Sequence, residues 1–274
     1  MNNQNNLTET ANNEFRLPVI VDGAEFTREE LADEMDGLHL NFQRVKIPAG
    51  GSLQFELPGD DPENPEYART LEGVIIYNHA SNAFWAEGGE DEENATPLCS
   101  SADGKLGCGD PGGDCVTCAL NKFGSGENGK GKACKNTRVL YLLRDGEYVP
   151  MQIVLPPTSI KPFNDFYNIA FAARRRGTCG SVVSVGLKRV ENGSNTYSIA
   201  TFKKMYDFAG EQLAQAKAYS EGFKAQIRAI NQTRLAEAGN RSNDEYTVYD
   251  ESVNNGKFEI STKTINGDKD DLPA

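Results

Sequence analysis

Histidine is nearly absent from this chain of 274 residues, which has only His39 and His79. Neither lies in a motif that ligates a metal or activates a nucleophile, so a hydrolytic zinc centre and a nucleophile–histidine pair are not expected. The many acidic residues also form no recognisable metal-binding carboxylate motif. We therefore predict no catalytic residues and a protein that is not an enzyme. A nuclease is the alternative that the sequence supports least.

Long apolar runs are missing as well, since no stretch approaches the roughly 20 apolar residues that a membrane span needs. The first residues, Met1 to Asn6, are polar and lack the charged-then-apolar pattern of a signal peptide. We expect a cytosolic protein. Because thiols stay reduced in the cytosol, the six cysteines are expected to bind a metal or remain free rather than form disulfides.

Positive charge is scarce overall, with 28 Lys and Arg residues against 40 Asp and Glu residues and a net charge of -12. Such a balance disfavours nucleic-acid binding, because phosphates repel an acidic protein. The distribution is uneven, however. Between Leu120 and Val190 the chain has twelve basic and four acidic residues, a local net charge of +8. This basic segment keeps a nucleic-acid partner compatible with the overall charge.

Four cysteines have the spacing of a zinc site: Cys99, Cys115, Cys118 and Cys134, with fifteen residues on either side of a central Cys-x-x-Cys. Thiolates at such spacings can surround one tetrahedral zinc ion. The stretch around them, about residues 86–136, is rich in Gly, Asp and Ser, and a loop of this length is rarely stable without a crosslink. We predict that structural zinc staples this insertion.

Cys108 competes with Cys99 for a place among the ligands, since both precede the Cys-x-x-Cys and spacing alone excludes neither. A redox pair is another interpretation of Cys-x-x-Cys. That motif usually sits between a strand and a helix, whereas Cys115 and Cys118 lie in a glycine-rich loop. Cys179 lies apart from the cluster and is expected to be a buried or spare thiol.

The region 40–208 is predicted to be mainly β. Runs rich in β-branched or aromatic residues, bounded by Gly, Pro, Asn or Asp, cover residues 42–47, 52–57, 72–78, 137–144, 148–155, 181–189 and 196–205. Asp145-Gly146 and Asn192-Gly193 predict hairpin turns. Short strands joined by hairpins favour closure into a small barrel, because closure removes open edges. We therefore predict a mainly β, α+β fold with an OB-like barrel.

Three helices are predicted around this barrel. Thr27-Arg-Glu-Glu30 forms a capping box for a helix over residues 27–36, and apolar spacing indicates helices over 164–176 and 209–238. Residues 240–274 have eight acidic and four basic residues without periodicity, which predicts a flexible acidic tail. The expected organisation is an N-terminal arm and short helix at 1–39, an OB-like core at 40–208 with the zinc-binding insertion at about 86–136, a helix at 209–239 and the tail at 240–274.

Non-specific binding of a single strand needs cations for the phosphates and aromatic rings on which bases stack. The glycine-rich run 124–135 is expected to act as a flexible basic finger. The arginines at 174–176 have a second explanation, since cations stabilise a helix C-terminus, and about half of any aromatic set is expected in the core. The candidate binding residues are Lys130, Lys132, Lys135, Arg138, Lys161, Arg174 and Arg175 for phosphates, and Trp85, Phe123 and Tyr141 for bases.

Four motifs give the chain a resemblance to a known family: Gly112-Gly-Asp-Cys-x-x-Cys118, Asn121-x-Phe-Gly-Ser125, Gly131-Lys-Ala-Cys-Lys-Asn136 and Leu155-Pro-Pro-Thr-Ser159. They are similar to uncharacterised proteins encoded by phages, prophages and mobile elements of bacteria, over roughly residues 40–205. The resemblance implies a genetic context, and with it the cytoplasm of a bacterial host, more than it implies an activity.

In its parts the chain also resembles the T-even phage helix-destabilising proteins, which combine an OB barrel, a zinc subdomain and an acidic C-terminal tail. Zinc ligands in that family include histidine, whereas here all four would be cysteine. The end of the chain, Asp268-Lys-Asp-Asp-Leu-Pro-Ala274, is similar to the acidic tip with which bacterial single-strand-binding proteins dock partners, although Lys269 and Ala274 depart from it. This likeness implies partner binding through Asp270, Asp271, Leu272 and Pro273.

The leading hypothesis is a sequence-tolerant single-stranded-DNA-binding protein of phage or mobile-element origin, which acts in replication or recombination and has replication or recombination proteins as possible partners. It would neutralise the backbone with cations and stack bases on aromatic rings. The alternative is a zinc-containing protein-interaction or regulatory factor that does not bind DNA and uses its acidic surfaces.

Overall fold

The computed structural model describes residues 15–17, 42–59, 64–85, 97–193 and 195–240. The predicted helix over 27–36 and the predicted tail beyond residue 240, with Asp270, Asp271, Leu272 and Pro273, lie outside these residues. The described chain forms a mixed α+β structure with a large mixed sheet and a long C-terminal helix. None of the described helices is both long and apolar enough to cross a membrane.

Strands make up most of the described elements. They are β1 (Arg44–Lys46), β2 (Phe55–Leu57), β3 (Glu66–Ala68), β4 (Thr70–Phe84), β5 (Cys99–Ser101), β6 (Leu106–Gly109), β7 (Gly113–Asp114), β8 (Lys135–Leu143), β9 (Met151–Leu155), β10 (Ser181–Asn192) and β11 (Asn195–Asp207). The α-helices are α2 (Pro157–Ala170) and α3 (Gly210–Asn240), and the 3-10 turns are η2 (Ala119–Asn121), η3 (Glu127–Gly129), η4 (Ala172–Arg174) and η5 (Thr178–Gly180). Each of the seven predicted strands is present.

Strand β4 organises the sheet because it pairs with three partners along its length, β10, β8 and, at its end, β5. Its first residues, 70–73, pair antiparallel with β10, and residues 74–83 pair antiparallel with β8. A register shift between Ile75 and Tyr77 marks a β-bulge, which bends the strand. β4 therefore links the β10–β11 hairpin to the β8–β9 hairpin, and β1 adds to β9 in parallel.

The predicted barrel is not closed by a hydrogen-bonded ladder. Among the described strands, β11 pairs only with β10, and β1 is the edge strand next to β9, so an opening remains between β1 and β11. The segment after β1 lies across this opening instead. The Nε of Arg189 donates to the carbonyl oxygen of Gly51 at 2.9 Å. The hydroxyl of Ser198 donates to the carbonyl oxygen of Ser52 at 2.6 Å. Isolated hydrogen bonds to a loop thus replace the last ladder of a barrel.

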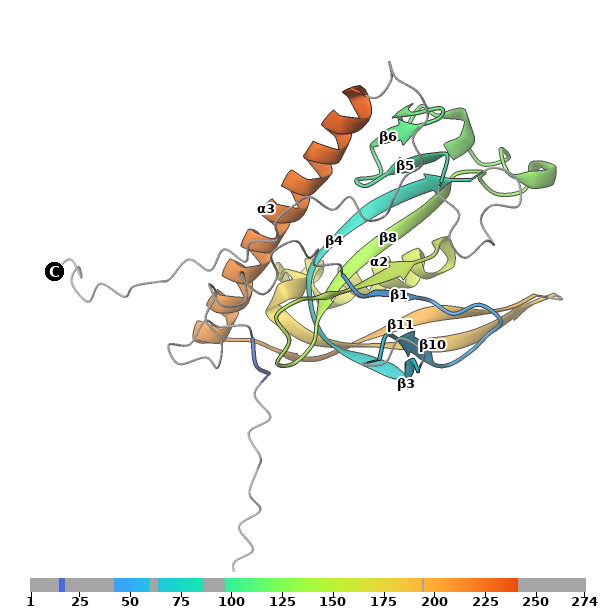
Figure 1. The fold of residues 1–274 in the computed structure, drawn as a ribbon. Coiled ribbons are helices and arrows are strands. Elements are labelled where there is room, and N and C mark those ends of the chain that lie inside the picture. The colour runs from blue at the N-terminus through green and yellow to red at the C-terminus, as the bar shows by residue number, and fades with distance from the viewer. Residues whose placement is uncertain (1–14, 18–41, 60–63, 86–96, 194, 241–274) are drawn as a thin grey trace, which may run out of the picture.

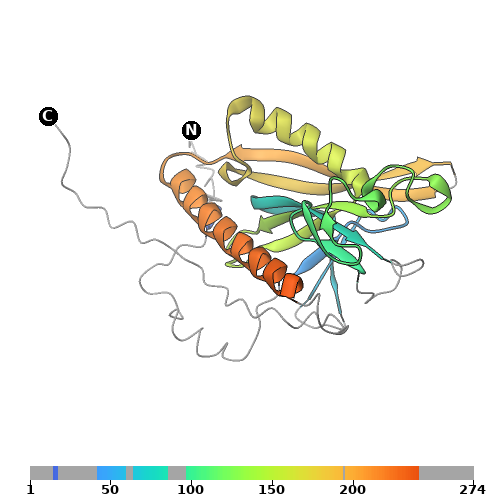
Figure 2. The ribbon, with the colours of Figure 1, turned by 90° about the horizontal axis from the view of Figure 1, so that it is seen from above.

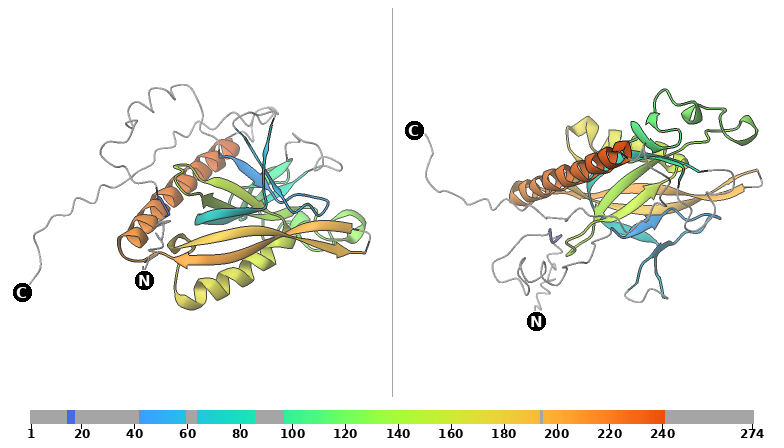
Figure 3. Two further views of the ribbon diagram at one scale, coloured as in Figure 1. Left: turned by 90° about the horizontal axis from the view of Figure 1, so that it is seen from below. Right: turned by 45° about the horizontal axis from the view of Figure 1, so that its top comes forward.

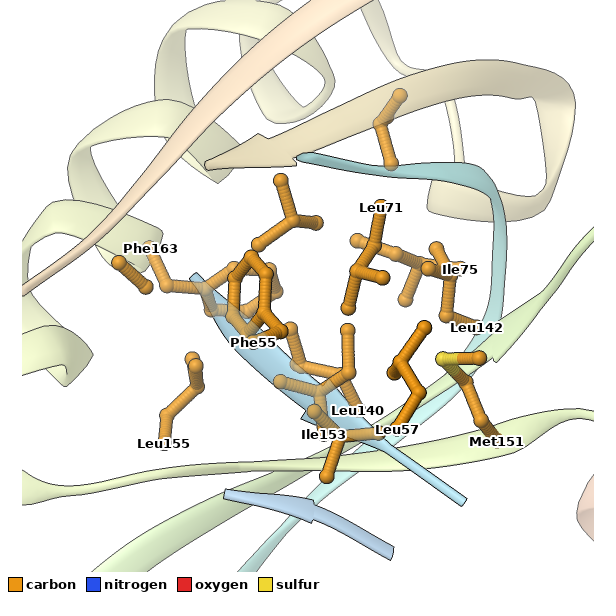
Figure 4. Close-up of a cluster of buried hydrophobic side chains, with 14 of the residues drawn as sticks. Phe55, Leu57, Leu71, Ile75, Leu140, Leu142, Met151, Ile153, Leu155 and Phe163 are labelled. Atoms are coloured by element: carbon orange, nitrogen blue, oxygen red, sulfur yellow. The ribbon is translucent and has the colours of Figure 1, made fainter. Parts of the chain in front are cut away.

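The bent sheet encloses one apolar core (Figure 4). Leu140 of β8, Ile153 of β9 and Val183 of β10 are fully buried in it, together with Phe163 of α2. The ring of Phe163 packs edge-on against Phe202 of β11, with ring centroids 5.3 Å apart. Helix α2 therefore completes the core that the strands leave open.

A second core lies on the opposite face of β4 and β8, under α3, which crosses that face diagonally (Figures 1 and 2). Phe223 and Ile227 of α3 are buried there against Tyr141 and Val139 of β8. The hydroxyl of Ser220 donates to the carbonyl oxygen of Ile76 at 2.6 Å. Ile76 is the bulged residue of β4, so the helix donates a hydrogen bond to a backbone carbonyl at the irregularity in the ladder.

Helix α2 differs from its predicted bounds of 164–176. It begins at Pro157 and ends at Ala170, and η4 follows it. Proline at the first helical position has its φ preset for the helix and loses no hydrogen bond there, so Pro156-Pro157 starts the helix. Pro162 lies inside the helix. Arg175, in the left-handed conformation at φ 51°, ends the following turn before Gly177 is reached.

Candidate nucleic-acid interface and cysteine centre

A cysteine-rich lobe, residues 97–134, interrupts the chain between β4 and β8. Its first strand, β5, pairs with the end of β4 and places Cys99 opposite Phe84, and β6 and β7 extend the sheet outward. Gly109 has a φ of +101°, and a Cβ there would lie 2.1 Å from the carbonyl oxygen of Leu98. Only glycine fits so close an approach. The lobe projects beyond the ends of β4 and β8 (Figure 1).

The four cysteines predicted to bind zinc, Cys99, Cys115, Cys118 and Cys134, line one cavity of about 10 Å³. That volume is close to what a single water molecule needs. Cys108 is not among the lining residues, which favours Cys99 as the fourth thiol. All six cysteines are free, and nowhere among the described residues do three His, Cys, Asp or Glu side chains lie close enough together to hold a metal ion. The thiols therefore share one space without forming a ligand set.

Burial favours the protonated form of three thiols in the lobe by raising their pKa values. It raises the pKa of Cys134 to about 11 and also raises the pKa of Cys99 and the pKa of Cys108. The neighbouring Cys115 adds to all three shifts, because two thiolates repel each other. A metal that binds here must displace protons, since the thiolate is the ligand.

An amide network joins the cysteine cavity to the sheet. Asn82 of β4 and Asn136 of β8 are directly opposite, and Nδ2 of Asn136 donates to Oδ1 of Asn82 at 2.7 Å and to Oδ1 of Asn121 at 2.9 Å. Nζ of Lys132 donates to Oδ1 of Asn136 at 2.7 Å and to Oδ1 of Asn121 at 3.1 Å. Nδ2 of Asn121 donates to the carbonyl oxygen of Cys115 at 2.6 Å. The ammonium of Lys132, a predicted phosphate contact, thus binds within the lobe, and the three asparagines were not among the predicted site residues.

The predicted aromatic platforms lie in three different environments. Phe123, between η2 and η3, is 84% exposed, and Trp85 at the end of β4 is half-buried. Tyr141 is only 4% exposed, and the rings of Phe42 and Phe223 lie edge-on to it. A base cannot stack on Tyr141 while α3 is in place, and Phe123 is the most exposed ring of the three.

The remaining predicted cations are spread over several elements and most have protein partners. Arg138 of β8 donates to Oδ1 of Asn78 and lies over the ring of Phe163, 5.5 Å from its centroid. Lys161 pairs with Asp165 one turn along α2 at 2.7 Å. The others are Lys130, exposed on the lobe; Lys135, half-buried at the start of β8; Arg174, which donates to the carbonyl oxygen of Ile169; and Arg175, exposed after η4.

The β10–β11 hairpin presents cations that the predicted site did not include. Lys188 and Lys203 are exposed, and alternation along the strands places them on the face opposite the apolar core. The hairpin and the lobe project to the same side of the molecule in all views (Figures 1, 2 and 3). The basic segment of the sequence extends as far as Lys188 and Arg189 and could have indicated this part of the surface.

Comparisons with known proteins identify no relative. No protein-family model matches the chain, and neither a curated protein nor a solved structure shows significant similarity to it.

Proposed function

We propose that this chain is a sequence-tolerant single-stranded-DNA-binding protein of phage or mobile-element origin, which acts in replication or recombination in a bacterial cytoplasm. The observation that carries the proposal is the order of the elements. The antiparallel pairs give the spatial order β9-β8-β4-β10-β11, with β4 shared between the two halves and α2 between β9 and β10 along the chain. This is the order of an OB barrel, here with one ladder open.

The OB comparison also assigns a role to the two projecting segments. OB barrels bind oligonucleotides on one sheet face and through the loops between their first and second and their fourth and fifth strands. In this chain the first of these connections is the cysteine-rich lobe and the other is the tip of the β10–β11 hairpin. Both carry an exposed lysine, Lys130 on the lobe and Lys188 in the half of the hairpin next to its tip. A single strand that passes between them would meet cations from both sides.

Charge supports this location despite the acidic total. Residues 119–136, which end the lobe, have four lysines and one acidic residue, Glu127. Neutralised phosphates release counterions, so such a surface binds with a strong dependence on salt and little dependence on sequence. Stacked bases add about 1–3 kcal/mol each.

Structural zinc belongs to the same proposal. The donor set fits zinc in kind, since Cys99, Cys115, Cys118 and Cys134 are four thiols around one cavity. When bound, zinc would supply a tetrahedral crosslink between β5, the Cys-x-x-Cys and the segment before β8. Asn121 already fixes the Cys115 backbone on the sheet side of this cavity.

The test is a fluorescence-anisotropy titration of labelled single-stranded DNA with the full chain across a salt series, with duplex DNA and RNA as competitors and zinc assayed in the same sample. We expect tight, salt-sensitive binding that tolerates any sequence and prefers single strands to duplex. Absence of binding at low salt by zinc-loaded protein would contradict the proposal.

One observation favours the second candidate, a protein-interaction factor. Val116 in the Cys-x-x-Cys is 77% exposed, and an open depression of about 480 Å³ nearby is lined by Phe84, Asp110 and Asp114, among others. Apolar and acidic groups together suit a protein partner better than DNA. A partner that remains bound after nuclease treatment, together with no DNA binding, would support this candidate instead.

A further inference from the structure

The tip of the lobe displays one aromatic ring in a way that folding does not explain. Phe123 is 84% exposed, more than any other large apolar side chain in the described residues. Burying a phenylalanine contributes about 1.5–3 kcal/mol to stability, and this ring contributes almost none of that. Single exposed apolar residues are common, so exposure alone assigns no role to Phe123. The backbone around the ring supplies the further reason.

The turn that carries Phe123 is held on both sides by backbone hydrogen bonds. The amide of Gly124 donates to the carbonyl oxygen of Gly131 at 2.6 Å, which joins the turn to the opposite side of the loop. The amide of Lys122 donates to the carbonyl oxygen of Ala119, and the amide of Ser125 donates to the carbonyl oxygen of Lys122, each at 3.2 Å. The ring is therefore exposed on a fixed backbone rather than on a loose loop.

The side chain of Ser125 adds a further brace. Its hydroxyl lies 2.6 Å from the carbonyl oxygen of Lys122 and 2.8 Å from that of Leu120, and it accepts the amide hydrogen of Ala133 at 3.1 Å. The amide of Cys134 donates to Leu120 at 2.9 Å. The turn is thus tied directly to the segment that carries one of the four clustered thiols. A rigid backbone lowers the entropy that a ligand must remove on binding.

The charges around the ring select the ligand. Lys122 and Lys130 are both exposed, and Lys130 makes no side-chain hydrogen bond or ion pair with the described residues. Glu127 is the only acidic residue between 119 and 136. A rigid ring with cations beside it suits a nucleotide that presents a base face to the ring and phosphates to the lysines.

We propose that the ring of Phe123 is a stacking platform for one unpaired base, with Lys122 and Lys130 on the flanking phosphates. The proposal rests on the single-strand binding proposed above and deepens it. In a duplex each base is already stacked on its neighbours, so the ring finds no free base face there. Stacking on Phe123 would therefore make the protein prefer single strands to duplex DNA.

The test compares Phe123→Ala, Phe123→Trp and Val116→Ala in the full chain. Val116 is the matched control, because it is a similarly exposed apolar residue of the same lobe. Each variant is titrated with an ordinary single strand and with one of equal length made of abasic units, which keeps the phosphates and removes the bases. Thermal unfolding of each variant checks that the fold is intact.

On the ordinary strand we expect Phe123→Ala to weaken binding roughly 5- to 150-fold with an unchanged salt slope, from the usual strength of one stacked base. Phe123→Trp should bind at least as tightly as the unmodified chain, and Val116→Ala should bind like it. On the abasic strand Phe123→Ala should have no effect.

Two failures are distinguishable. If the unmodified chain binds no single strand, the proposed function fails. If it binds, but Phe123→Ala leaves affinity unchanged or weakens binding equally on the abasic strand, the function stands and the stacking role is wrong.

Discussion

The β-rich core and the cysteine-rich lobe of this chain are held together by different forces. In the core, Leu140, Ile153 and Val183 are fully removed from solvent. Within residues 97–134 the buried positions are Ser101, Gly107, Cys115 and Cys134, with no buried aliphatic or aromatic side chain. The fold of the lobe is held by hydrogen bonds and by close backbone contacts at glycines. Its four clustered thiols surround one small cavity. The core is stabilised by apolar burial, whereas we expect the lobe to need the directional crosslink that zinc would supply.

The largest expected effect follows from removing that crosslink. If zinc is bound by the four thiols, its binding free energy is also folding free energy for the lobe, on the order of 10 kcal/mol in small zinc modules. We expect chelation, or Cys115→Ser, to raise amide hydrogen exchange throughout residues 97–134 while β9 and β10 keep their protection. Hydrogen exchange with mass spectrometry checks this. Equal loss in both regions would show that lobe and core are one cooperative unit.

A smaller effect, now on the core, is expected from Leu140→Ala. The substitution leaves a cavity in a fully buried site, which lowers the free energy of unfolding by about 2–5 kcal/mol. Leu106→Ala is the matched control, because Leu106 lies in the lobe and is exposed, and its change should stay within about 0.5 kcal/mol. Urea unfolding followed by circular dichroism measures both. Similar losses for the two variants would remove the distinction between the regions.

The smallest effect concerns two lysines of the lobe. Lys132→Met removes donors to Asn121 and Asn136, and we expect it to weaken local stability of the lobe by about 1 kcal/mol. Lys130→Met should leave lobe stability unchanged and reduce the salt slope of DNA binding instead. Hydrogen exchange of the lobe and salt-dependent anisotropy separate the two. A stability loss for Lys130→Met equal to that of Lys132→Met would contradict the assignment.

Sequence patterns predicted most of the core. Alternation and β-branched residues identified β8 to β11, and the apolar spacing of the last helix predicted α3 to within about two residues. The run Val139-Leu-Tyr-Leu-Leu143 is apolar on both faces, which is typical of a strand covered on both sides. It could have indicated that Tyr141 is buried and unavailable for stacking. The change of partners along β4 has no such signal, because a bulge depends on pairing between distant strands.

The lobe was predictable only in part. Cysteine spacing left Cys99 and Cys108 as alternatives beside Cys115, Cys118 and Cys134, and the cavity is lined by Cys99 and not by Cys108. Strands β5, β6 and β7 have two to four residues each, which is too short for a recognisable alternation. The asparagine network was not predictable, since Asn82, Asn121 and Asn136 become neighbours only once β4 pairs with β8.

The bulge in β4 has a consequence for the order in which the chain folds. The carbonyl of Ile76 is taken by Ser220, 144 residues further along the chain. Contacts between such distant residues form slowly, because the loop between them must close first. On the ribosome the strands β4 and β8 emerge and can pair before α3 is synthesised, and until then the apolar face with Val139 and Tyr141 is open to solvent. Newly made chains are therefore expected to depend on timely docking of their last helix to avoid association through this face.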